Sequence, residues 1–536
     1  MPIINQIVKG GGGSAPTGTK SITANGVYDV TDFASADVQV PTTAPAYYIE
    51  KTVDANGKLN NSSTLINLNG VTDLGNNVLS SAYTQSSISG AIDLSSLTKI
   101  SGTYAAQKAF ASCSGITSVD LSNVEVISGT YACDTMFNAD SNITSVNLGS
   151  LKIVGNGGST CKSMFESCSG ITSIDLSKLT VINGSCQSMF SGCSSLAGSV
   201  DLSDLIVASG SQAMSYIFAG TKITSIDLSG LIVLSGYGSM ERAFHNCTSL
   251  TNVNISKLAK FNTASNQLSY TFYGCTSLTS LSFNNLAYVT TNLNNLFANM
   301  LQGVTGCTVH FPAEWQTTMS SWSNVTNGFG GTNTTVLFDL PNVTTLDMSS
   351  VVDVEVDNLF NTFDRNNYFP NVTGINLSNL TTVSSYRGFY EGFYGSTNVT
   401  TVDLSSLTTV SGNESCLEMF QGSGISGAVN LSSLTTVSGE KGCASMFANC
   451  SGITSVNLSS LSTITGTFGC SNMFYGCTGL TTISFPALTT LLNPSVLSGI
   501  VNNTTGVTLH FPAALANEGI TTLIVGGTNT TILFDL

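Results

Sequence analysis

The sequence predicts a solenoid, in which short coils of chain stack on one another along one axis. Three observations predict it. A strand-like segment recurs every 26 to 28 residues, and an aromatic residue followed three positions later by cysteine recurs between its copies. Apolar residues make up 42% of the 536 residues and charged residues only 9%. The chain therefore has the apolar content for a long, continuous core.

The strand-like segment is clearest at residues 116–129, where Val119 and Leu121 alternate with Ser118 and Asp120. Such alternation is typical of a strand with one apolar and one polar face. A short strand buries its apolar face only against equivalent neighbours, so the copies are expected to stack as a parallel sheet. The last apolar position of the segment recurs in two series, at Leu94, Leu121, Leu148, Leu176, Leu202, Leu228, Ile255 and Phe283, and then at Leu377, Leu404, Leu431, Leu458 and Phe485.

The aromatic element follows each strand at a fixed distance and reads Met-Phe-x-x-Cys in its clearest copies, such as Met189 to Cys193. It is expected to form about one helical turn on the wall opposite the strands, with the Phe pointing inward. A column of glycines also follows the strand, at the same number of residues in each copy. Glycine suits a turn that needs positive φ. The column consists of Gly129, Gly184, Gly236, Gly412, Gly439 and Gly466.

The spacing Leu-x-x-Leu-x-Leu-x-x-Leu resembles the leucine-rich-repeat signature, and the aromatic-x-x-Cys element resembles the bacterial surface-adhesin subclass of that family. The resemblance covers roughly residues 62–536. It implies a leucine-rich-repeat solenoid that is curved and right-handed. A parallel β-sheet would form its concave face, and short helical or 3-10 turns its other wall.

Two near-identical segments divide the solenoid. His310-Phe-Pro and the stretch ending at Leu340 match His510-Phe-Pro and the stretch ending at Leu536. Atypical terminal repeats cap a solenoid, so each segment is interpreted as an end unit. The expected domains are a docking peptide with a Gly-rich linker (1–20), a small β segment with its connection (21–61), a first module with its cap (62–340) and a second module with its cap (341–536).

The N-terminal region has a different character. Ile3, Ile4, Ile7 and Val8 form a short apolar peptide, and a glycine linker follows. Asn25-Gly26 between strand-like runs is a hairpin signal. The stretch SITANGVYDVTDFASADVQVP resembles a small β segment near the start of tail and fibre proteins of phages and prophages of gut Firmicutes. This resemblance implies that Ile3, Ile4, Ile7 and Val8 dock the chain on a virion.

The sequence offers no catalytic, metal or cofactor site. Thirteen of the fourteen cysteines fall in two columns at repeat spacing, which predicts small buried thiols rather than ligands or disulfides. His310 and His510 are equivalent cap positions, for which structural roles are expected. The net charge of −15 argues against nucleic acid and anionic membranes as partners, and no apolar run is long enough to span a membrane.

The polar face of the strands is the expected binding surface, because its hydroxyls, amides and carboxylates repeat at a fixed pitch. That arrangement suits multidentate contact with a repetitive surface polymer such as a cell-wall glycan. The alternative is a solvated face whose Asn and Ser side chains bond one another. The candidate residues are Ser118, Asp120, Ser122, Ser145, Asn147, Ser173, Asp175, Ser177, Ser225, Asp227, Ser229, Asp403 and Asn457.

These features predict a non-enzymatic phage or prophage tail fibre or receptor-binding protein that recognises the bacterial host surface. Its expected partners are a virion protein at the N-terminus and a host glycan or surface protein at the solenoid, and it is a possible homo-oligomer. It would be assembled in the host cytoplasm and act outside the cell, on the virion. The alternatives are a bacterial cell-surface adhesin, and a virion decoration or scaffold protein without a ligand of its own.

Overall fold

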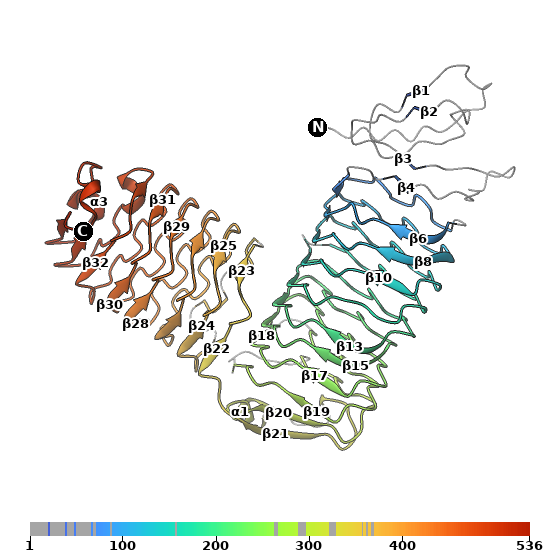
Figure 1. Cartoon of the computed structure of the whole chain (residues 1–536). Coiled ribbons are helices and arrows are strands. Elements are labelled where there is room, and N and C mark those ends of the chain that lie inside the picture. The colour runs from blue at the N-terminus through green and yellow to red at the C-terminus, as the bar shows by residue number, and fades with distance from the viewer. Residues whose placement is uncertain are drawn as a thin grey trace. The chain divides into compact units, whose positions relative to one another are not determined.

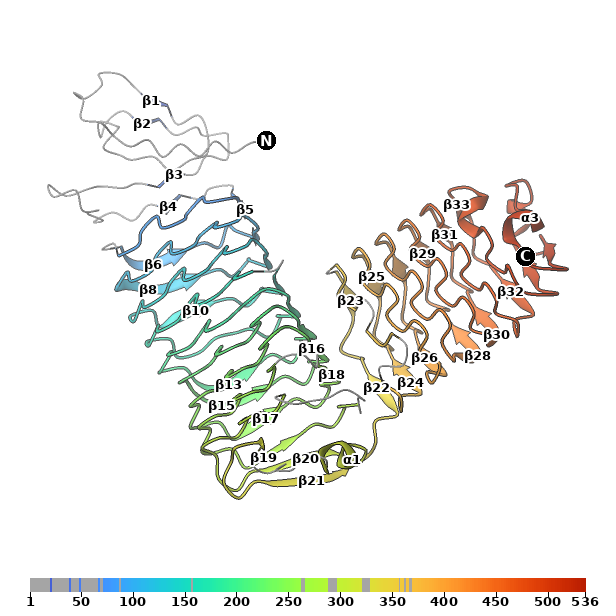
Figure 2. The ribbon, with the colours of Figure 1, turned by 180° about the vertical axis from the view of Figure 1, so that it is seen from behind.

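The computed structural model describes residues 71–536 except 86–87, 156–157, 262–265, 288–295, 321–327, 356, 361–362 and 366–368, together with four short strands nearer the N-terminus. The chain divides into two compact units. Unit 1 comprises residues 1–284 and 292–340, and unit 2 comprises residues 285–291 and 341–536. Figures 1 and 2 show that each unit is built from stacked coils of similar shape.

The four N-terminal strands form two separate pairs. Strand β1 (Lys20–Ser21) pairs in parallel with β2 (Val38–Gln39), and β3 (Tyr48–Ile49) pairs antiparallel with β4 (Ile66–Asn67). The expected Asn25-Gly26 hairpin and the expected docking residues Ile3, Ile4, Ile7 and Val8 lie outside the described residues.

The first strand of each coil carries the alternating pattern seen in the sequence, and its neighbours are parallel and mostly in register. In unit 1 these strands are β6 (Ser89–Asp93), β8 (Gly115–Asp120), β10 (Ser145–Asn147), β13 (Ala197–Asp201), β15 (Lys222–Asp227), β17 (Asn252–Asn254), β19 (Ser280–Ser282), β20 (Thr308–Pro312) and β21 (Thr335–Leu340). In unit 2 they are β22 (Thr345–Asp347), β24 (Gly374–Asn376), β26 (Thr401–Asp403), β28 (Ser426–Asn430), β30 (Gly452–Asn457), β32 (Thr482–Ser484), β34 (Thr508–His510) and β35 (Thr531–Leu533). We call the solvent side of these strands the strand face.

A second, two-residue strand follows in most coils and builds a second parallel sheet in each unit. In unit 1 it comprises β5 (Asp73–Leu74), β7 (Lys99–Ile100), β9 (Val126–Ile127), β11 (Ile153–Val154), β12 (Val181–Ile182), β14 (Val207–Ala208), β16 (Val233–Leu234) and β18 (Lys260–Phe261). In unit 2 it comprises β23 (Asp353–Val354), β25 (Thr382–Val383), β27 (Thr409–Val410), β29 (Thr436–Val437), β31 (Thr463–Ile464) and β33 (Thr490–Leu491).

The third side of each coil, which we call the turn wall, is a run of linked turns where the sequence predicts a helical turn. In one coil, Lys441, Ser445 and Asn449 have positive φ, so every fourth residue is left-handed. The amides of Cys443 and Phe447 donate to carbonyl oxygens of the next coil at 2.8 and 3.0 Å. The left-handed residues prevent a continuous helix, and the freed amides join neighbouring coils instead.

The core is a ladder of rings that runs along each unit. In unit 1 the rings of Phe110, Phe137 and Phe165 stack nearly parallel, with centroids 5.0 and 5.3 Å apart, and all three side chains are fully buried. The same stacking continues in unit 2 from Phe393 through Phe474. The prediction that these residues point inward is confirmed.

The glycine column has a different cause from the one that the sequence suggested. None of Gly129, Gly184, Gly236, Gly412, Gly439 and Gly466 has positive φ. A Cβ atom on Gly129 would instead lie 2.0 Å from the carbonyl oxygen of Gly102 in the preceding coil. The prediction of positive φ was therefore wrong: glycine is needed because adjacent backbones touch here, so a methyl group has no space.

Each unit ends in a distinct cap that contains the helical elements of the described chain. In unit 1 the helix α1 (Trp315–Ser320) follows β20, and Trp315 is fully buried; Trp322 lies outside the described residues. In unit 2 the 3-10 helix η2 (Pro494–Leu497) precedes β34 in the chain, and the 3-10 helix η3 (Ala513–Leu515) and the helix α3 (Thr522–Val525) follow it. In unit 1 the Trp315 ring lies 5.9 Å from that of Phe311, centroid to centroid.

Candidate functional site

The strand face brings most of the predicted binding residues into straight columns. Ser118 is in register with Ser145, and Asp120 with Asn147. Ser173 and Asp175 lie between β10 and β13, in a coil that forms no strand at this point. The predicted residues are all exposed or half-buried: Ser118, Asp120, Ser122, Ser145, Asn147, Ser173, Asp175, Ser177, Ser225, Asp227, Ser229, Asp403 and Asn457.

The Asp and Asn column has a structural role that also fixes its orientation. The Asp120 carboxylate accepts a hydrogen bond from the Ser122 backbone N–H at 2.9 Å, and Asp175 accepts from Ser177 at 3.0 Å. Asn457 accepts from Ser459 at 3.1 Å through its amide oxygen. These are Asx turns, and those of Asp120 and Asn457 end a strand. One oxygen of each side chain is thereby occupied, and the other polar atom remains for contacts outside the coil.

The Asx turns favour the ionised form of two carboxylates of the column, Asp93 and Asp175. Hydrogen bonds from the side chain and backbone of Ser95 hold the pKa of Asp93 below its usual value. The backbone N–H and then the hydroxyl of Ser177 lower the pKa of Asp175 in the same way. Asp93 and Asp175 therefore present a charged acceptor near neutral pH, whereas the Asn positions present a neutral amide.

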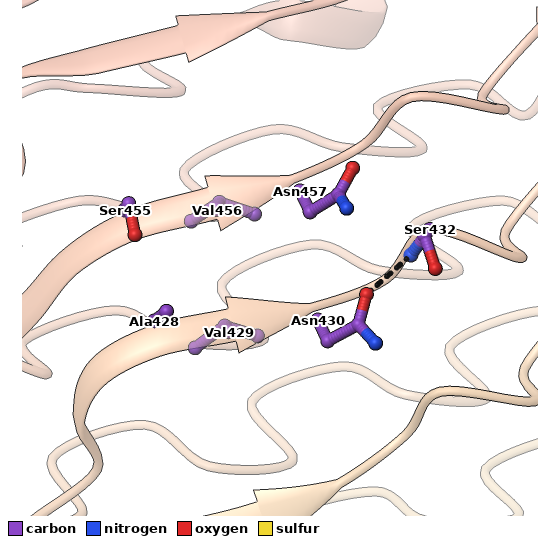
Figure 3. Close-up of a pocket in the computed structure, with 7 residues that line it drawn as sticks. All are labelled: Ala428, Val429, Asn430, Ser432, Ser455, Val456 and Asn457. Atoms are coloured by element: carbon purple, nitrogen blue, oxygen red, sulfur yellow. Dashed lines mark hydrogen bonds between the residues drawn. The ribbon is translucent and has the colours of Figure 1, made fainter.

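A shallow hollow of about 440 Å³ interrupts the strand face of unit 2 between β28 and β30 (Figure 3). It is lined by Ala428, Val429, Asn430, Ser432, Ser455, Val456 and Asn457. The register between the two strands shifts between Gly427 and Ala428, where Gly427 has φ +77°. The sequence analysis included Asn457 but missed the hollow, although Ser-Gly-Ala in place of Gly-Ile-Thr-Ser was a visible signal.

The cysteines are interior packing groups, as the sequence predicted. All fourteen are buried free thiols. In the column that follows the Phe, the Cys168 thiol donates to the Phe137 carbonyl at 3.0 Å and the Cys193 thiol to the Phe165 carbonyl at 3.2 Å. Burial raises the pKa of Cys193 to about 12. A thiol that stays protonated is a poor nucleophile and a poor metal ligand.

One carboxyl interrupts this thiol column. Asp140 stands three residues after Phe137, where the neighbouring coils have Cys113 and Cys168. Its side chain is fully buried; one oxygen accepts the Cys113 backbone N–H, and the other has no hydrogen-bond partner. Burial raises the pKa of Asp140 to about 8, against the opposing effect of that hydrogen bond. The carboxyl is therefore largely protonated at neutral pH.

Asp140→Cys is expected to increase the free energy of unfolding at pH 7 by about 2–4 kcal/mol. The unfolded chain ionises this carboxyl near its ordinary pKa of 3.8, whereas the folded chain keeps the proton up to about pH 8. The folded state therefore loses stability relative to the variant as pH rises from about 4 to 8, and the gain should nearly vanish near pH 4. Urea unfolding at both ends of this range measures it; a gain that is independent of pH would contradict the assignment. The exposed Asp175→Asn is the control and should show little change between pH 5 and 8.

The two caps contain a His–Asp pair that the sequence analysis missed. His310 Nδ1 lies 2.9 Å from both carboxylate oxygens of Asp339, and His510 Nδ1 lies 2.9 and 3.1 Å from those of Asp535. Asp339 lies in the last strand of unit 1 and Asp535 two residues after the last strand of unit 2, and each is joined to the histidine of the preceding strand. The duplicated His-Phe-Pro and Leu-Phe-Asp-Leu motifs were the signal, but their spacing does not reveal the contact.

A second group of partly exposed side chains lies on the turn wall of unit 1. The Arg242 guanidinium lies 4.5 Å from the Tyr270 ring centroid and 5.5 Å from that of Tyr216, and the rings of His245 and Tyr273 stack at 4.5 Å. Burial, and then the Arg242 charge, lower the pKa of His245. Because the rings and the guanidinium stack on one another along the coil axis, most of their flat faces contact other side chains of the protein and not solvent. We therefore place the candidate site on the strand face.

Among the residues that the structure describes, no three His, Cys, Asp or Glu side chains are grouped so that they could hold a metal ion. Within the same residues, no helix has both the length and the apolar character needed to cross a bilayer.

The stacked parallel coils, the buried Phe ladder and the polar strand face define a repeat protein of the leucine-rich-repeat class. The sequence profile of the BspA-type leucine-rich repeat region matches residues 106–237, 158–302 and 362–504. The chain therefore belongs to the BspA-type leucine-rich-repeat family.

Solved structures with similar coils come from several bacteria. A leucine-rich repeat protein from Bacteroides ovatus is 15% identical; the match covers 82% of this chain and 91% of that chain, with a TM-score of 0.23. A leucine rich cell surface protein from Faecalibacterium prausnitzii is 13% identical, with 92% and 96% covered and a TM-score of 0.26. An internalin from Listeria monocytogenes is 11% identical, with 82% and 83% covered and a TM-score of 0.19. No curated protein matches the sequence.

Proposed function

We propose that this chain is a non-enzymatic binding protein that recognises a repetitive polymer on a bacterial surface through its strand face. The supporting observation is the column of Asp and Asn side chains whose orientation is fixed by Asx turns such as Asp120–Ser122 and Asn457–Ser459. Preorganised polar groups lose little conformational entropy on binding. Groups repeated at the strand spacing of about 4.8 Å engage a polymer at several points at once, which raises the overall affinity.

The setting that we propose for this activity is a phage or prophage tail fibre that binds the host surface. Its support is the resemblance of residues 21–41 to the small β segment of tail proteins. The N-terminal peptide would bind a virion partner by adding a strand to a sheet edge, and the solenoid would contact a host glycan or surface protein. A bacterial surface adhesin is the second candidate, and membership of the BspA-type family favours it.

Binding to cell-envelope fractions tests the proposed recognition. Ser145→Gln combined with Ser173→Gln places two longer side chains on the exposed strand face and is expected to reduce envelope binding by about tenfold. The matched control is Ser112→Gln with Ser167→Gln, at two exposed positions of the turn wall, and should bind as the unmodified chain does. Equal loss in both variants, or no envelope binding by the unmodified chain, would refute recognition through the strand face.

Removal of residues 1–40 separates the two settings. A tail fibre without this segment should no longer be incorporated into particles, while its solenoid stays folded by circular dichroism. Particles that still carry the shortened chain would contradict virion docking and leave the adhesin as the better explanation.

A further inference from the structure

The hollow on the strand face of unit 2 contains two amide groups whose donors are free. The Ser432 backbone N–H donates to the Asn430 side chain at 3.1 Å, and the Ser459 backbone N–H donates to Asn457 at 3.1 Å. A backbone N–H can only donate, so the accepting atom must be the amide oxygen in both cases. The NH₂ groups of Asn430 and Asn457 have no hydrogen-bond partner in the described part of the chain and remain available as donors (Figure 3).

A pair of free amides on adjacent strands is not general in the column. Asn147 and Asn254 are each in register with a carboxylate, Asp120 and Asp227. Asn376 occupies the equivalent position on β24, but its NH₂ group donates to Asp347 of the neighbouring strand at 3.2 Å. Asn430 and Asn457 are in register on adjacent strands. Because such strands lie about 4.8 Å apart, both NH₂ groups can reach one carbonyl oxygen, which has two lone pairs.

The rest of the hollow supplies a small apolar contact and two hydroxyls. Ala428 is in register with Ser455, so a methyl group stands where the neighbouring strand carries a hydroxyl. Ser455 and Ser432 complete the rim. The site therefore combines paired donors, a methyl surface and hydroxyl acceptors, and no Lys, Arg or His side chain lines it. With a net charge of −15 on the chain, this set favours a neutral ligand over an anion.

We propose that the hollow between β28 and β30 binds the acetamido group of an N-acetylated sugar. The acetamido carbonyl oxygen accepts from the NH₂ groups of Asn430 and Asn457, its methyl group packs on Ala428, and its N–H donates to a rim hydroxyl. This proposal rests on the proposed recognition of a surface polymer and names the chemical class of the ligand. A sugar with a hydroxyl in place of the acetamido group offers neither the carbonyl nor the methyl.

Unit 1 contains the natural counterpart with the opposite polarity. Strands β6 and β8 show the same register shift, between Gly90 and Ala91, and pair Ala91 with Ser118. Asp93 and Asp120 take the places of the two amides, and each accepts from the serine two residues later at 2.9 Å. Their outward atoms are charged acceptors, which repel an acetamido carbonyl. Two strand pairs with the same register shift therefore carry different side chains: a pair of donors on β28 and β30 in unit 2, and a pair of acceptors on β6 and β8 in unit 1.

Calorimetric titration of the full chain with two matched tetrasaccharides tests the proposal. Chitotetraose carries acetamido groups, and cellotetraose carries hydroxyls in their place. Chitotetraose is expected to bind at least about tenfold more tightly. Asn430→Asp with Asn457→Asp keeps the Asx turns, because Asp already occupies equivalent in-register positions at Asp201 and Asp227. This variant should lower chitotetraose affinity by at least about tenfold. The matched control is Asn449→Asp with Asn472→Asp, at two exposed positions of the turn wall of unit 2, and it should leave the affinity unchanged.

A gain of binding is the complementary result. Asp93→Asn with Asp120→Asn converts the acceptor pair of unit 1 into a donor pair, so the number of chitotetraose molecules bound should rise from one to two. Equal affinity for both tetrasaccharides, or unchanged affinity in the Asn430→Asp/Asn457→Asp variant, would overturn the acetamido site. Envelope binding without chitotetraose binding would also overturn it and leave the proposed function standing. Failure to bind either would refute both.

Discussion

Gly129→Ala is expected to destabilise unit 1 by about 4 kcal/mol or more, which is the upper range for a single substitution. The new Cβ atom would lie 2.0 Å from the carbonyl oxygen of Gly102, far inside van der Waals contact. Backbone on both sides is tied by hydrogen bonds between coils, among them Ser128 N–H to the Ile100 carbonyl at 3.0 Å. To relieve this clash, two coils would have to move apart, and that movement would break the contacts that hold the solenoid together. Urea unfolding followed by circular dichroism measures the loss.

Gly149→Ala is the matched control for this prediction. Its Cβ atom would lie 3.2 Å from the outward carboxylate oxygen of Asp175, which belongs to an exposed side chain and not to the backbone, so a small adjustment relieves the contact. The change should cost about 1 kcal/mol or less. If the two alanines were equally tolerated, the close approach of backbones at the glycine column would not be the reason for glycine there.

Phe190→Ala is expected to cost about 3–5 kcal/mol, the range for removal of a buried aromatic ring. The ring is fully buried and stacks between Phe165 and Phe218, with centroids 5.6 and 5.8 Å away. Truncation leaves a cavity and removes two stacking contacts at once. Because a solenoid can open locally, hydrogen exchange of the amides in coils 165–218 should rise more than that of distant coils.

Ser177→Ala provides the contrast on the strand face. The hydroxyl donates to Asp175 at 2.8 Å in an exposed position, and the backbone N–H of residue 177 continues to cap Asp175. A change of no more than about 0.5 kcal/mol is expected. Similar losses for Phe190→Ala and Ser177→Ala would contradict the division into a buried and an exposed side of the coil.

The repeat made much of this fold predictable. The alternation of Val119 and Leu121 with polar residues gave the strands, and a period of 26 to 28 residues gave their stacking. The inward direction of Phe190 followed, because one apolar column can be buried only against its own copies. The turn wall was less predictable, since positive φ at residues such as Lys441 and Ser445 has no strong signature in side-chain type.

The sequence by itself determined the period and the two sides of each strand, because both depend on which residues are apolar at a fixed interval. Only the tertiary structure decided why Gly129 must be glycine, that Asp140 is buried among thiols, and which atoms of Asn430 and Asn457 face outward. Those properties depend on contacts between residues one coil apart and on which partner already holds each oxygen. Spacing along the chain carries neither kind of information.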